Sequence, residues 1–83
     1  MKFVRGRISE GILANGTKKA FAVVAEGRYW QSPAEMKWVP RSICEIGERY
    51  ENGYVEITIP LWWFWKNEAK PEGVNGFSVE EIY

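Results

Sequence analysis

Alternating hydrophobic and polar residues predict several β-strands. Over residues 54–59, Val55, Ile57 and Ile59 alternate with polar side chains, which is typical of a strand with one buried face. Residues 18–26 carry apolar side chains on both faces, so we expect them to form a central strand. Further strands are predicted at residues 2–13, 36–39 and 43–50.

Turn residues divide these strands. The dipeptide Asn15-Gly16 favours positive φ angles and predicts a tight hairpin, and the segment 51–53, which ends in Asn-Gly, predicts a second one. Pro40 is expected to end the strand before it, because proline has no N–H group to donate to a ladder.

The segment after Pro60 predicts a short helix. Leu61 to Lys70 has good helix formers at its end, and Pro71 would close it. Continuation as a strand is the alternative, since aromatic residues favour strands. For residues 77–83 an edge strand, a short helix and a frayed tail all stay open.

These elements predict one mainly β (α+β) domain over residues 1–83. We expect a small curled antiparallel sheet or an open barrel of about five strands, with one short helix after Pro60. The length of 83 residues fits one domain, and the 16% aromatic content is typical of a chain that folds.

Charge and composition exclude several classes of function. Eleven basic residues balance eleven acidic ones, which gives no general argument for binding duplex nucleic acid. The sequence contains no His and no Asp, so a His-dependent triad and a His-ligated metal site are excluded. Cys44 lacks a His partner and is expected to be a buried small side chain. The spacing of Glu45, Glu48 and Glu51 does not indicate catalysis.

We therefore predict a non-catalytic protein without cofactor or metal. The longest apolar stretch, residues 59–65, is too short to span a bilayer, and no signal-peptide pattern opens the sequence. The expected location is the cytoplasm of a host cell.

The run Leu61-Trp62-Trp63-Phe64-Trp65 is the main candidate for function. On a helix these five apolar residues cover the whole circumference. Leu61 and Trp65, four residues apart, are expected to face the sheet, which leaves other tryptophans without cover. Trp62, Trp63 and Trp65 are thus candidate anchors for a protein partner or for self-association. The alternative is that all three fill a small aromatic core.

A second hypothesis is binding of single-stranded nucleic acid. Aromatic residues between basic ones on a sheet can stack on bases, although half-buried strand aromatics more often belong to a core. Trp38 is expected to pack inward by default. The candidate residues are Tyr29, Trp30, Trp38, Arg28 and Arg41.

Three short stretches resemble a known group of proteins. Residues 19–24 (KAFAVV), 37–42 (KWVPRS) and 57–62 (ITIPLW) are similar to a pattern in small, uncharacterised proteins encoded by bacteriophages and mobile elements. The resemblance implies a phage-like origin and a shared fold, without implying a chemical activity. Inhibition of a host defence enzyme is a third hypothesis.

Overall fold

The computed structural model describes residues 1–27 and 33–83 of the chain. This part forms seven strands, two short α-helices and a 3-10 helix, and strands take 58% of it. The prediction of a mainly β fold is therefore confirmed. In chain order the elements are β1 (Phe3–Ser9), α1 (Glu10–Ala14), β2 (Ala20–Gly27), β3 (Glu35–Pro40), η1 (Arg41–Ile43), β4 (Glu45–Arg49), β5 (Tyr54–Pro60), α2 (Leu61–Lys66), β6 (Ala69–Val74) and β7 (Phe77–Ile82).

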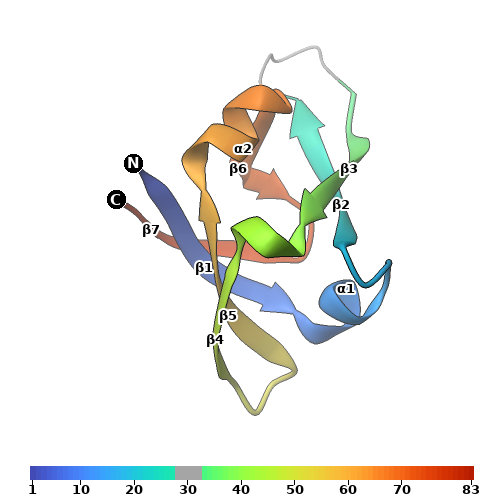
Figure 1. Cartoon of the computed structure of the whole chain (residues 1–83), viewed down its shortest axis with the longest axis vertical. Coiled ribbons are helices and arrows are strands. Elements are labelled where there is room, and N and C mark those ends of the chain that lie inside the picture. Colours follow the sequence, from blue (N-terminus) through green and yellow to red (C-terminus); the bar gives the residue numbers. More distant parts are fainter. Residues whose placement is uncertain (28–32) are drawn as a thin grey trace.

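The strands form two antiparallel sheets instead of one curled sheet of about five strands (Figure 1). The four-stranded sheet has the order β4-β5-β1-β7, and the three-stranded sheet has the order β3-β2-β6. In the described part of the chain the sheets do not close into a barrel. Within the described residues β1 pairs with two strands that come much later in the chain, β5 and β7, and its register with β5 runs from Phe3 opposite Pro60 to Ser9 opposite Tyr54.

The core lies where the inner faces of the two sheets meet. Val55, Ile57 and Ile59 are buried on β5, which confirms the face predicted from their alternation. The central position of β2 is also confirmed. The core cluster consists of Val4, Ile8, Phe21, Val23, Ala25, Val39, Ile57, Ile59, Trp63, Phe64, Ala69, Val74 and Phe77.

The outer face of the three-stranded sheet is more exposed than predicted. Val24 on β2 pairs with Met36 on β3, and both side chains are exposed. Trp38 was expected to pack inward, but 47% of it is exposed and its neighbour Val39 is buried instead. Consecutive strand residues point to opposite faces, so only one of these two apolar side chains can enter the core.

The first strand is shorter than predicted, and a helix that the sequence did not predict follows it. β1 ends at Ser9, and residues 10–14 form α1 in place of a continued strand. Ile12 and Leu13 both pack against the core, which adjacent residues of a strand cannot do. Asn15-Gly16 thus connects α1 to β2 and does not form the predicted hairpin.

The predicted hairpin at residues 51–53 is confirmed, since β4 and β5 pair antiparallel on either side of it. Gly53 has a φ of 82°, in the left-handed region. Asn75-Gly76 makes a further tight turn, which leads from β6 in one sheet to β7 in the other.

The helix after Pro60 is confirmed, but it is shorter than predicted. α2 ends at Lys66, and Glu68 has a φ of 54°, which stops the helical path. Pro71 lies within β6, an edge strand, where a missing N–H group is tolerated. Residues 77–82 form an edge strand, one of the three alternatives.

Candidate interaction surface

Helix α2 separates its tryptophans into buried and exposed ones. Trp63 is 2% exposed and Phe64 is fully buried, whereas Trp62 is 41% and Trp65 is 58% exposed. The expectation that Leu61 and Trp65 face the sheet is therefore wrong for Trp65. Trp63 and Phe64 are the buried pair because α2 packs its middle against β5 and β6.

Trp63 is a core residue and not an exposed anchor. Its indole Nε1 donates a hydrogen bond of 3.1 Å to the carbonyl oxygen of Trp38. Its ring meets Phe64 edge-on, with centroids 5.1 Å apart and planes at 86°. The hydrogen bond connects α2 to β3, and the prediction that Trp63 binds a partner is not supported by its buried position.

Trp62 and Trp65 border an apolar hollow. Its lining also includes Met1, Leu61 and Lys2, and its volume is about 210 Å³. The N-terminus reaches this place because the amide of Leu61 donates to the carbonyl of Lys2, at 2.9 Å, where β5 leads into α2. No local pattern in the sequence predicts that Met1 lines this surface, since the contact depends on the pairing of β1 with β5.

The residues proposed for stacking on nucleic acid are only partly brought together. Trp38 is exposed on β3, but the guanidinium of Arg41 is directed to the α1–β2 connection. There its Nε donates to Thr17 O at 3.0 Å and its Nη2 to Leu13 O at 2.6 Å. Arg28, Tyr29 and Trp30 lie outside the described residues.

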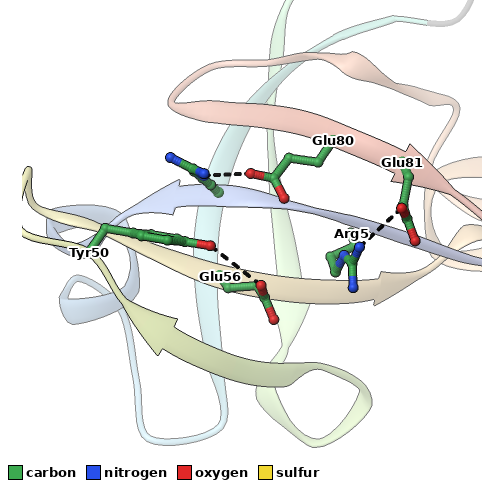
Figure 2. A network of polar contacts seen from close by, with 6 residues as sticks. Arg5, Tyr50, Glu56, Glu80 and Glu81 are labelled. Atoms are coloured by element: carbon green, nitrogen blue, oxygen red, sulfur yellow. Dashed lines mark hydrogen bonds and ion pairs between the residues drawn. The ribbon is translucent and has the colours of Figure 1, made fainter.

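The outer face of the four-stranded sheet carries a network of polar contacts (Figure 2). Arg5 forms an ion pair with Glu81 at 3.0 Å, and Tyr50 OH donates to Glu56 at 3.4 Å. Arg7 bonds Glu80 and lies over the Tyr50 ring, 4.1 Å from its centroid.

These contacts neutralise the basic side chains of β1. The hydrogen bond to Glu80 raises the pKa of Arg7, and the Coulombic contribution of Glu80 acts in the same direction. With Arg5 paired as well, the described residues of this face offer no unbalanced positive patch to a phosphate backbone.

The Cys44 thiol is not activated as a nucleophile. Burial raises the pKa of the Cys44 thiol to about 11, although Arg41 opposes this shift, so the thiolate is scarce near neutral pH. Among residues 1–27 and 33–83, no three His, Cys, Asp or Glu side chains are placed to hold a metal ion. In the same part of the chain no helix has the length and apolar character needed to cross a membrane.

Comparison with known protein families, with curated proteins and with solved structures finds no match to this chain.

Proposed function

We propose that the protein is a non-catalytic interaction module that binds a protein partner through the surface around Trp62. The observation that carries this proposal is the pair of exposed tryptophans beside an apolar hollow on a helix of six residues. Tryptophan is enriched at binding hot spots because it contributes a large contact area with few rotatable bonds. Trp62 and Trp65, with Leu61 and Met1 beside them, are the proposed contacts.

The size of the hollow favours a side chain of a protein as its occupant. Its volume of about 210 Å³ is below the roughly 300–1,000 Å³ that is common for small-molecule pockets. Its lining is almost wholly apolar apart from Lys2, so an aliphatic or aromatic side chain fits it best.

The exposed area favours a different protein over a second copy. The exposed fractions of Trp62 and Trp65, 41% and 58%, add up to about one whole tryptophan, or roughly 150–250 Å². Permanent homodimers commonly bury roughly 2,000–5,000 Å² in total, whereas transient complexes between different proteins can bury less than about 1,200 Å². A partner that inserts one anchor side chain needs much less area from this surface.

A pull-down from a bacterial lysate tests the proposal. The resemblance to bacteriophage proteins makes a host protein the first partner to seek, and a defence enzyme is one such protein. We expect a bound protein that Trp62→Ala loses and Trp38→Ala retains, because Trp38 is exposed on a different element. Equal recovery by wild type and Trp62→Ala, or recovery of no protein by wild type, contradicts the proposal. Sedimentation of wild type should show a monomer.

Binding of single-stranded nucleic acid is the second candidate. Exposed Trp38 and its neighbours Met36 and Val24 offer a flat apolar face on which bases can stack. An oligonucleotide at low salt would then quench tryptophan fluorescence in wild type and less in Trp38→Ala. Absence of quenching at low salt rejects this candidate.

A further inference from the structure

A second hollow lies between α1 and the strands β4 and β5, apart from the tryptophan surface. Its volume is about 390 Å³. Apolar side chains line part of it, and of these Ile46 is unusual because 55% of it is exposed on an edge strand. Glu10, Arg41 and Arg49 supply the charged part of the lining.

The charges in this hollow do not balance. Arg49 Nη1 lies 2.9 Å from Glu10 Oε1, so these two residues form an ion pair. Glu10 Oε1 is buried yet accepts no hydrogen bond within the described part, so this contact is an ion pair without hydrogen-bond geometry. Arg41 has no acidic partner in that part of the chain. Two arginines against one glutamate leave one net positive charge.

Arg41 is held in a fixed position and still has hydrogen-bond donors to offer. Its Nε and Nη2 donate to backbone carbonyls of Thr17 and Leu13, and its guanidinium lies 5.6 Å from the centroid of the Phe21 ring. Its Nη1 donates to no described residue. A half-buried guanidinium fixed in this way loses little entropy when it binds an anion, and its planar shape suits a carboxylate.

We propose that this hollow binds a carboxylate that carries a short aliphatic chain. Arg41 Nη1 donates to the carboxylate, and Ile46 and Leu13 contact the chain. Such a ligand is either the C-terminal residue of a polypeptide or a free carboxylic acid. The site shares no lining residue with the surface around Trp62, so each proposal can fail without the other.

An NMR titration with matched small molecules tests this site. The probes are N-acetyl-leucine, which mimics a peptide C-terminus, 4-methylpentanoate, which is a free acid with the same branched chain, and N-acetyl-leucinamide, which has no charge. We expect the Arg41 Nε–H and Ile46 amide signals to shift with a Kd on the order of millimolar for a carboxylate of this size. The amide should bind at least about tenfold more weakly, because it cannot pair with the guanidinium.

The relative affinity of the two acids identifies the source of the ligand. Tighter binding of N-acetyl-leucine indicates a polypeptide C-terminus, and equal or tighter binding of 4-methylpentanoate indicates a free acid. The proposal is wrong if the uncharged amide shifts both signals as strongly as the acids do, or if neither acid shifts them.

Two variants examine the charge and the apolar contact separately. Glu10→Gln removes the competing negative charge and should tighten carboxylate binding by about two- to fivefold. Ile46→Ser should weaken it by about fivefold, since it removes apolar contact with the chain. Ile82→Ser is the matched control, because Ile82 is similarly exposed on β7 and does not line the hollow. An unchanged affinity in both Glu10→Gln and Ile46→Ser overturns the assignment.

Discussion

Replacing Gly6 by alanine should strongly destabilise the protein. A Cβ atom at Gly6 would lie 2.8 and 2.9 Å from two ring carbons of Phe77, and the carbonyl oxygen of Ser78 would be closer still. The Phe77 ring is buried in the core and Ser78 belongs to the backbone of β7, so neither can move aside freely. The strain falls on the β1–β7 pairing, where Gly6 lies next to a shift in register.

These contacts give the loss in the free energy of unfolding that Gly6→Ala should cause. Overpacking in a core costs about 1–3 kcal/mol, and the loss of two ladder hydrogen bonds as β7 moves away would cost about 2 kcal/mol more. The total of about 3–5 kcal/mol is a large part of the roughly 4–12 kcal/mol expected for a domain of 83 residues.

Urea denaturation followed by tryptophan fluorescence and circular dichroism measures this loss. Gly11→Ala is the matched control, because its Cβ would meet only Ser9 Oγ, at 3.7 Å, on the exposed side of α1. The control should be more stable than wild type by about 0.5–1 kcal/mol, since alanine favours a helix. If Gly6→Ala unfolds at the same urea concentration as wild type, the close approach of β1 and β7 is wrong.

Two other substitutions test the core near α2 and β3. Trp63→Phe removes the donor to Trp38 O and should cost about 1–3 kcal/mol in urea denaturation, and a loss as small as that of exposed Trp62→Phe would contradict this bond. Alkylation of Cys44 should be slow at neutral pH and accelerate toward its pKa of about 11. Because folding raises this pKa from 9.0, the stabilising contribution of the thiol is complete below pH 9 and declines as the pH rises toward about 11. Cys44→Ala should remove that decline, and an identical pH profile in the variant would refute the assignment.

The strands that the sequence predicts best are those with one polar face. Val55, Ile57 and Ile59 alternate with side chains that prefer water, so local pattern alone determines which face is buried. The glycine in the turn at residue 53 was also identifiable, because its backbone conformation limits the residue type.

The sequence did not predict which side chain is buried where adjacent residues are equally apolar. Trp38 and Val39 compete for one inward position, and the choice of Val39 follows from its pairing with Phe21 on β2. Along α2 every residue from Leu61 to Trp65 is hydrophobic, so periodicity carries no information about the buried face. The contacts of α2 with β5 and β6 determine which of its residues are buried.

The second hollow was not predictable because its charged residues are far apart in the sequence. Glu10 follows β1, Arg41 follows β3 and Arg49 ends β4. The neighbouring aromatic residues predict Arg41 as a nucleic-acid contact, whereas the structure directs its guanidinium to backbone carbonyls near α1.

The pairing of β1 has a consequence for how the chain folds. β1 pairs with β5 and β7, so its first hydrogen-bonded partner in the sequence lies more than forty residues away, as the pair Ser9 and Tyr54 shows. Contacts of such long separation slow folding, which places this small domain among those that take milliseconds to seconds. Until β5 is made, the apolar residues Val4 and Ile8 stay on an unpaired strand that can join another chain. Newly made protein is therefore most prone to aggregate before residues 54–60 are available to cover its first strand.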